Sequence, residues 1–397
     1  MAYHTGRMKR MKRKNTEKRS DAENTSFYTG TTQKKRINQV DLLKGLAIIS
    51  VILIHTFPDE LLALIGAPFY LWQAVPVFLL LAAFTGSLVY TSRNRKNLSD
   101  LYDPSLLARR FRRILLPFSL IWVIQVVVIL YLLPGDLSLH TRYVTLFASG
   151  IPGIAANFFS GGSGPGNYFI PVILQQILLL PVFYWLAVRF SPDRMLVIAC
   201  AANIVLEYGA VLFGVPPGIY TNSYLPYMML GALGVWLAFQ SGKTPPWLVV
   251  AGALSALYIT AVYYFGFHVW FIDTAGEFFN VFSYFWTVLL VAAGLRFLSP
   301  QSVTLLSGTV RELGRASWHI FLVQMTFLAF FEGAMIASIT ASIPGSGIWH
   351  ALVCQALLTV PSLGVCLLLG YGFYRSDERV KTWMHGKTPS RPPGAGR

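Results

Sequence analysis

Long apolar stretches alternate with short polar stretches along most of this sequence. A bilayer hydrocarbon core of about 30 Å is crossed by roughly 20 helical residues. About ten stretches approach that length, namely 42–57, 69–90, 114–133, 168–188, 195–213, 225–239, 247–265, 278–298, 317–336 and 349–371. The pattern predicts an all-α, polytopic integral membrane protein with about ten transmembrane helices.

The composition agrees with this prediction and excludes two other classes of protein. Of the 397 residues, 54% are hydrophobic and only 12% are charged, against about 25% charged residues in soluble domains. A chain disordered throughout and a disulfide-stapled secreted module are therefore excluded. The cysteines, Cys200, Cys354 and Cys366, all lie in apolar runs, so we expect neither a disulfide framework nor a metal site.

The basic residues indicate how the chain is threaded. Twelve of the 32 Lys and Arg residues precede or begin the first apolar run. With the N-terminus in the cytoplasm and ten crossings, only Arg142 lies outside, as the positive-inside rule requires. We therefore expect both termini in the cytoplasm, and the net charge of +15 reflects topology and not a nucleic-acid partner. A basic disordered tail over 1–38, a transmembrane domain over 39–375 and a cytosolic tail over 376–397 follow from this threading.

One further apolar segment, 144–160, could be an eleventh crossing. A crossing there would invert everything downstream and spread the basic residues over both sides, so we expect an outer re-entrant or surface segment. The glycine-rich run 161–166 that follows has no Lys-Ser/Thr and no preceding strand. It is therefore expected to be a flexible turn and not a phosphate-binding loop.

The first predicted helix carries three ionisable residues on one face. Lys44 and His55 are eleven residues apart, which is about 20° more than three full turns, and Asp41 lies about 40° from the same line. The imidazole would lie about 16 Å deeper than the lysine. A structural His bonded to a neighbouring carbonyl is one explanation. The aligned Lys and Asp favour a functional His instead, because ionisable groups in a bilayer are costly to keep.

A basic cluster precedes the third predicted helix, with Arg109, Arg110, Arg112 and Arg113 in five consecutive residues. Residues three apart on a helix are neighbours, and paired guanidinium groups suit phosphates. A lipid headgroup would satisfy them as well as a nucleotide, and a purely topological anchor is the other alternative.

Glu207 is a second intramembrane candidate. It would lie about 18 Å into the fifth predicted helix, close to the depth of His55. Its carboxylate could orient the imidazole of His55. A neutral, hydrogen-bonded Glu is an equally good interpretation.

These landmarks, in this order, resemble acyltransferase family 3, a family of membrane-bound acyltransferases. The family shows an Asp, a basic residue and, after ten more residues, a His in its first helix, which Asp41, Lys44 and His55 match. Its Arg-x-x-Arg motif before the third helix is matched by Arg110 and Arg113.

Later parts of the chain match the family less closely. Pro76 and Phe78 of a Pro-x-Phe motif are present, but Ala82-Ala83-Phe84 stands where Ser-Gly-Phe is usual. In a late helix that begins Ser317-Trp318, Gln324 stands at the usual position of a His. The resemblance covers roughly residues 38–375.

The resemblance implies a multi-pass enzyme of the cell membrane. It would transfer an acyl group, commonly acetyl, from cytosolic acyl-CoA to a hydroxyl of an extracytoplasmic or lipid-linked carbohydrate-type acceptor. His55 would be the general base or a transient acyl carrier, and Asp41 would position Lys44 or another residue at the cytosolic mouth. Glu207, from its depth alone, stays the further catalytic candidate. Lys44, Arg110 and Arg113 would bind the phosphates of the donor, acyl-CoA (acetyl-CoA in the commonest case). Membrane lipid is the remaining expected partner, and no metal is implied.

Two other functions remain open from the sequence. A transporter that exports a small metabolite or carbohydrate could use His55 and Glu207 as proton-coupling groups. A structural subunit of a polysaccharide-assembly complex would leave His55 replaceable.

Overall fold

The computed structural model of the chain describes residues 37–132, 148–240, 244–267, 280–298, 304–343 and 348–384. All regular structure within these ranges is helical, as the sequence predicts. Several parts of the chain lie outside the described residues, namely residues 1–36 of the predicted N-terminal tail, Arg142, Lys243 and residues 385–397.

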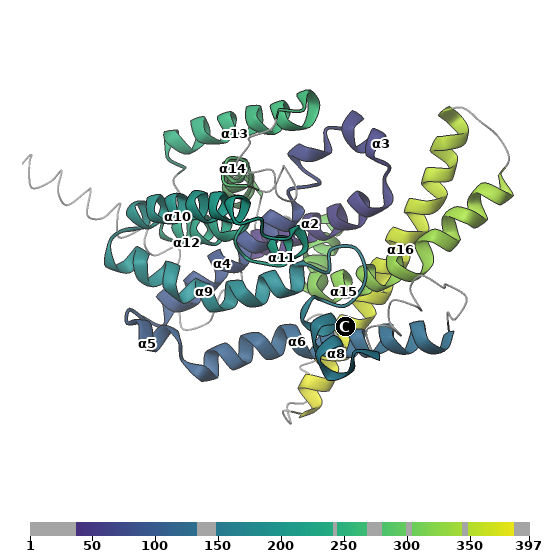
Figure 1. Cartoon of the computed structure of the whole chain (residues 1–397), viewed down its shortest axis with the longest axis horizontal. Helices are drawn as coiled ribbons and strands as arrows, with labels where there is room; N and C mark the ends of the chain where they lie inside the picture. Colours follow the sequence, from purple (N-terminus) through teal and green to yellow (C-terminus); the bar gives the residue numbers. More distant parts are fainter. Residues whose placement is uncertain are drawn as a thin grey trace, which may run out of the picture.

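The helices follow the apolar runs in order (Figure 1). The shorter helices are α3 (Asp59–Leu64), the 3-10 helix η1 (Ala67–Phe69), α5 (Leu98–Leu101), α8 (Gly150–Phe159) and α11 (Pro217–Thr221). The bundle itself is formed by α2 (Asn38–Thr56), α4 (Ala74–Ser92), α6 (Pro104–Val127), α9 (Phe169–Arg189), α10 (Pro192–Leu212), α12 (Met228–Phe239), α13 (Pro246–Phe265), α14 (Tyr284–Phe297), α15 (Leu305–Ser342) and α16 (Ile348–Met384).

Eight helices of the described residues are long and apolar enough to cross a membrane. The other two predicted crossings, α12 and α14, have 12 and 14 residues, and α12 is buried over most of its length. Large apolar side chains on α6, α10 and α13 face outward, which suits contact with lipid tails. The molecule is thus a polytopic, all-α membrane protein, and the count of ten crossings stays a prediction.

Two helices begin earlier than the apolar runs predict, because a polar side chain caps each start. Asp103 accepts the Ser105 backbone N–H at 2.8 Å and starts α6, ten residues before the apolar run. Thr304 caps α15 in the same way through Ser307. Such caps satisfy backbone donors that a helix start leaves free. The last helix, α16, continues to Met384, so the first part of the predicted C-terminal tail is helical.

Contacts between side chains show which helix ends lie together at one end of the bundle. The rings of Tyr90, at the end of α4, and Tyr184, at the end of α9, have centroids 5.1 Å apart. The Trp236 indole, at the end of α12, donates to Asp193 at the start of α10 (2.7 Å). Successive bundle helices therefore alternate in direction, as repeated crossing requires.

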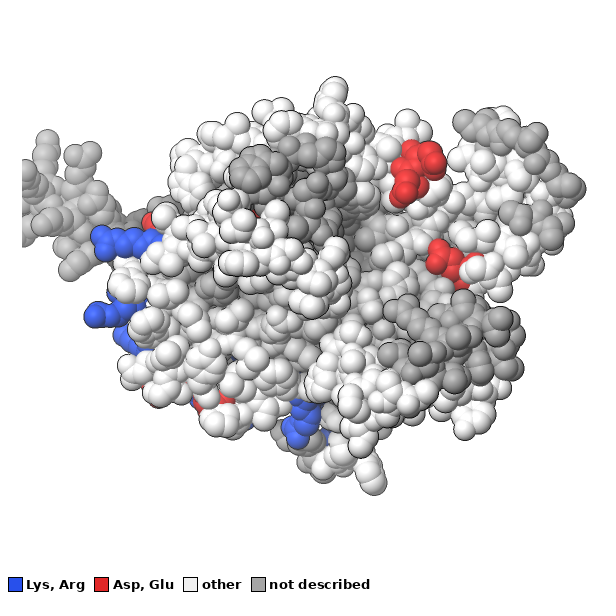
Figure 2. Space-filling model, in the orientation of Figure 1, with Lys and Arg blue, Asp and Glu red and all other residues white. Residues whose placement is uncertain are grey.

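The described Lys and Arg residues lie near helix termini that share this end, which we call the basic end. In Figure 2 the visible Lys and Arg side chains lie along the left and lower edges of the face, where some acidic side chains lie beside them, and further acidic side chains lie on the right. The opposite end carries His55, α3 and the glycine-rich turn 161–166. This separation agrees with the predicted threading, and the side that faces the cytoplasm stays a prediction.

The segment at 144–160 is described from residue 148 onward. It contains the ten-residue helix α8, about 15 Å long, which is shorter than a membrane core. Residues 144–147 lie outside the described residues.

The helices α2 and α15 cross at two glycines. A Cβ on Gly314 would lie 1.7 Å from the carbonyl oxygen of Asp41, and one on Gly45 would lie 2.0 Å from that of Val310. Only glycine allows backbones to approach this closely. The crossing anchors α2, and with it His55, to the longest helix of the described residues.

Candidate active site

His55 lies in the last turn of α2, at the opposite end from the basic cluster. Its imidazole is half-buried, and neither ring nitrogen has a hydrogen-bond partner among the described residues. The next carbonyl, that of Thr56, accepts a hydrogen bond from Gln355 of α16, which ties the end of α2 to that helix. The structure thus presents an imidazole that is held in place by its backbone while both nitrogens stay available.

The glycine-rich turn packs beside this imidazole. A Cβ on Gly166 would lie 3.9 Å from His55 Nε2 and 3.2 Å from a ring carbon of Phe321. Gly161, Gly162 and Gly166 have φ values of +92°, +75° and +84°, which side chains disfavour. The turn differs from the predicted flexible segment, because its glycines let the backbone fold tightly against neighbouring helices.

Gln125 of α6 holds the turn in place. Its side-chain N–H groups donate to the Ser163 carbonyl and to the Thr326 hydroxyl, both at 3.0 Å. Its side-chain oxygen accepts the Ser163 backbone N–H at 3.2 Å. The side chain is fully buried, so these bonds link α6, the turn and α15. Sequence reasoning missed Gln125 and Gly166 as site residues, and the only signal was the repeated glycine.

Asp41 and Lys44 lie one helix length away, at the basic end of α2. The Asp41 carboxylate is buried and accepts a hydrogen bond from Arg315 Nε of α15 at 3.4 Å. Arg315 also pairs with Glu312 on its own helix. Asp41 therefore connects α2 to α15 electrostatically, next to the glycine crossing.

Arg110 is the member of the basic cluster that turns into the bundle. Its guanidinium lies over the Tyr90 ring, 4.7 Å from the centroid. It donates to the Tyr90 hydroxyl at 2.8 Å and to the Gly86 carbonyl at 3.4 Å. Arg112 and Arg113 are exposed, and neither has a partner among the described residues. Arg109 donates to the Ser105 hydroxyl at 3.4 Å. The predicted pair therefore splits into one positioned cation and one exposed cation.

Glu207 is buried within α10. Its carboxylate accepts a hydrogen bond from Asn203, one turn earlier, at 2.9 Å. No hydrogen bond joins Glu207 to His55 in the described part of the chain. A role of Glu207 in orienting the imidazole stays a prediction.

Two other polar residues of α15, Gln324 and His319, are buried. Gln324 is fully buried, and neither atom of its amide group has a partner among the described residues. His319 Nε2 lies 2.9 Å from an Asp377 oxygen of α16. His319 belongs to the basic end, so it is separate from the surroundings of His55.

The arrangement places cations at one end of the bundle and an available imidazole at the other. An imidazole with a free nitrogen can accept a proton or form a covalent bond to an acyl group. Within the described ranges, no three His, Cys, Asp or Glu side chains gather into a group that could hold a metal ion.

Comparisons with known proteins give one match. The family model described as "Acyltransferase domain" matches residues 37–371. Comparison with curated proteins and comparison with solved structures find no match.

Proposed function

Because the chain belongs to acyltransferase family 3, whose model matches residues 37–371, we propose that it transfers an acyl group from acyl-CoA to a hydroxyl. The donor, in the simplest case acetyl-CoA, is cytosolic, and the acceptor is an extracytoplasmic or lipid-linked carbohydrate-type molecule. The observation that carries this proposal is the unpartnered, half-buried imidazole of His55. It lies on the same helix as Lys44, about 16 Å further along.

The donor enters from the basic end, which we assign to the cytosol. Its phosphates meet Arg110, Arg113 and Lys44, because charge-assisted hydrogen bonds to phosphate are strong. The thin arm of the donor then extends between helices toward His55. The glycine turn borders the imidazole, and Phe321 packs against the same glycine, Gly166, so the reacting carbonyl is delivered beside Gly166.

The chemical step balances with His55 as general base. A ring nitrogen accepts the proton of the acceptor hydroxyl, and the oxygen attacks the thioester carbonyl. The new C–O bond forms, the C–S bond breaks, and the CoA thiolate takes the proton back from the imidazole. In the alternative, the imidazole nitrogen attacks the thioester carbonyl, the C–S bond breaks and the CoA thiolate leaves. The acceptor oxygen then attacks the acyl-imidazole, the C–N bond breaks, and the hydroxyl proton passes to the thiolate. Both routes require an imidazole with an available nitrogen.

The test is transfer of labelled acetyl from acetyl-CoA in inside-out membranes, followed by identification of the labelled product. His55→Ala and His55→Gln should each lower transfer by about 10²–10⁴-fold, because Gln cannot accept a proton at neutral pH. His350→Gln is the matched control. It also removes an imidazole, but the nitrogen of His350, unlike those of His55, is bonded to a protein group, the Ile343 carbonyl. Near-normal turnover of His55→Gln would remove both roles of His55, and a transporter would then explain the bundle better.

A further inference from the structure

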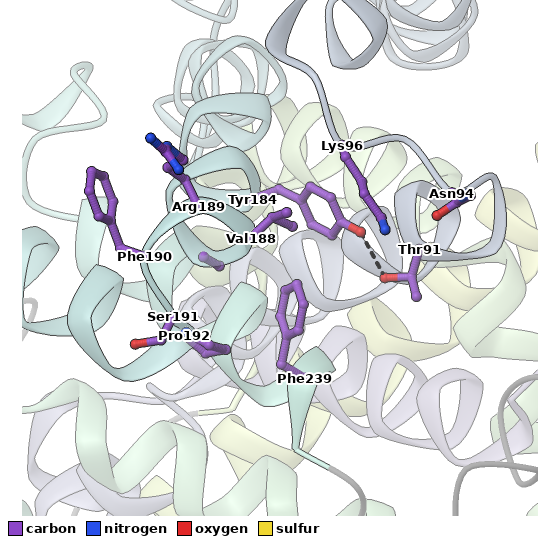
Figure 3. A pocket seen from close by; sticks show the side chains of 11 residues that line it. Thr91, Asn94, Lys96, Tyr184, Val188, Arg189, Phe190, Ser191, Pro192 and Phe239 are labelled. Atoms are coloured by element: carbon purple, nitrogen blue, oxygen red, sulfur yellow. Dashed lines mark hydrogen bonds between the residues drawn. The ribbon is translucent and has the colours of Figure 1, made fainter.

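A cavity of about 530 Å³ opens at the basic end of the bundle. Figure 3 shows its walls, which come from the end of α4, the end of α9, the start of α10 and the end of α12. Its volume is typical of sites for small ligands. Its lining contains neither His55 nor Arg110.

Two cations line the cavity without a protein partner. Lys96 and Arg189 are exposed, and neither forms a hydrogen bond or an ion pair with any described residue. No carboxylate belongs to the described lining, and the nearest in the chain, Asp193, is bonded to the Trp236 indole. The helix α10 begins at Pro192 on the rim, which adds a partial positive charge. The cavity therefore favours an anion, and a phosphate above others.

Aromatic rings form another wall of the cavity. The rings of Tyr184 and Phe239 have centroids 5.5 Å apart at an angle of 35°. Tyr184 is buried, and its hydroxyl is fixed by Thr91 at 3.1 Å, as Figure 3 shows. Tyr184 thereby holds the half-buried Phe239 ring in place. An aromatic ring beside cations suits a planar base that carries phosphate, because bases stack on aromatic rings.

The cavity adjoins the positioned cation of the basic cluster. The rings of Tyr184 and Tyr90 have centroids 5.1 Å apart. The guanidinium of Arg110 lies 4.7 Å from the centroid of the same Tyr90 ring. A ligand with phosphates at more than one position could therefore engage both the cavity and Arg110.

We propose that this cavity binds the nucleotide end of the acyl donor, with phosphate at Lys96 and Arg189 and the base against Phe239. Naming the ligand as the donor rests on the proposed function, while the preference for a nucleotide rests on the cavity alone. A lipid headgroup would offer the same phosphate without the base, so the experiment separates these two sources.

The experiment measures equilibrium binding of radiolabelled CoA to the purified full chain in nanodiscs of neutral phosphatidylcholine. Lys96→Ala and Arg189→Ala should each weaken binding about tenfold, the loss of one charge-assisted contact. Val188→Trp should weaken it further by filling the cavity, and Val188 is exposed enough to accept the larger side chain. Arg93→Ala and Arg194→Ala are matched controls, because both are exposed cations at the same end that do not line the cavity.

The outcomes decide between the sources. Adenosine 3′,5′-bisphosphate should displace labelled CoA, and phosphatidylglycerol added to the nanodiscs should not. Displacement by phosphatidylglycerol, or normal CoA affinity in Lys96→Ala, Arg189→Ala and Val188→Trp, would overturn the proposal. CoA binding that depends on the cavity in a protein that transfers no acyl group would contradict the proposed function alone. If the protein transfers acyl groups but its CoA affinity does not depend on Lys96 and Arg189, only the assignment of the cavity would be wrong.

Discussion

Gly166 lies directly against the imidazole of His55, with its hypothetical Cβ only 3.9 Å from Nε2. His55 belongs to the last turn of α2 and Gly166 to the turn that precedes α9, more than one hundred positions further along the chain. The contact makes the glycine turn a wall of the candidate active site, and it leads to the first prediction.

Gly166→Ala should lower acyl transfer by about tenfold to a hundredfold, because small displacements of reacting groups are costly. The added Cβ forces a shift of the turn or of Phe321, which packs against the same glycine. Gly214→Ala is the matched control, since Gly214 also has a positive φ but has nothing within 4 Å of its Cβ. Both variants should lose about 1–2 kcal/mol of stability from backbone strain, measured by thermal unfolding in detergent. Equal activity in the two variants would show that the turn is merely structural.

Arg110→Ala should weaken CoA binding by about 1.5–3 kcal/mol, the value of a hydrogen bond to a charged group. Arg113→Ala should weaken it as well, and the double variant should lose more than either. Arg112→Ala is the control, since it removes an exposed cation from the same turn. Because Arg110 also contacts Tyr90, a thermal unfolding curve should accompany each binding measurement. Unchanged affinity in the double variant would reduce the cluster to a topology signal.

The ion pair between Asp41 and Arg315 predicts coupled effects of substitution. Asp41→Asn or Arg315→Gln should each destabilise the protein by about 1–2 kcal/mol, because the remaining charge loses this partner, Asp41 in a buried position and Arg315 in a half-buried one. The double variant should be less destabilised than the sum of the two single variants. Thermal unfolding of all four proteins gives the coupling energy, and strict additivity would mean that the two side chains do not interact.

The threading predicts which side each end of the bundle faces. In a variant that lacks the three native cysteines, Asp59→Cys on α3 should react with a membrane-impermeant maleimide in intact cells. Arg93→Cys at the basic end should react only after the membrane is opened, because positive charge stays in the cytoplasm. Both positions are exposed in the structure, so accessibility of the side chain does not limit the reaction. The reverse pattern of labelling would invert the topology.

Hydropathy predicted which parts of the chain form helices and in what order. Each apolar run became a helix, but hydropathy does not record where a helix ends. Polar residues such as Asp103 and Thr304 determine those starts, so α6 and α15 begin before their apolar runs. The family match confirms the resemblance stated for Asp41, Lys44 and His55.

The site was predicted only where its residues share one helix. The face that holds Lys44 and His55 follows from helical periodicity. The contacts of Gly166 with His55 and of Gln125 with Ser163 join distant parts of the chain, and a periodicity argument holds no information about them. The pairing of Asp41 with Arg315 could not be predicted either, because it joins two helices that are far apart in the sequence.

The glycine crossing of α2 and α15 also limits the path that a long donor can follow. At Gly45 and Gly314 the two backbones touch, so that seam between the helices is shut to any passing chain of atoms. Lys44 precedes Gly45 by one residue, about 100° around the helix, and His55 lies on the side of Lys44. A donor arm of the kind proposed would therefore have to pass along the neighbouring face of α2, which carries Lys44 and His55, and not through the crossing.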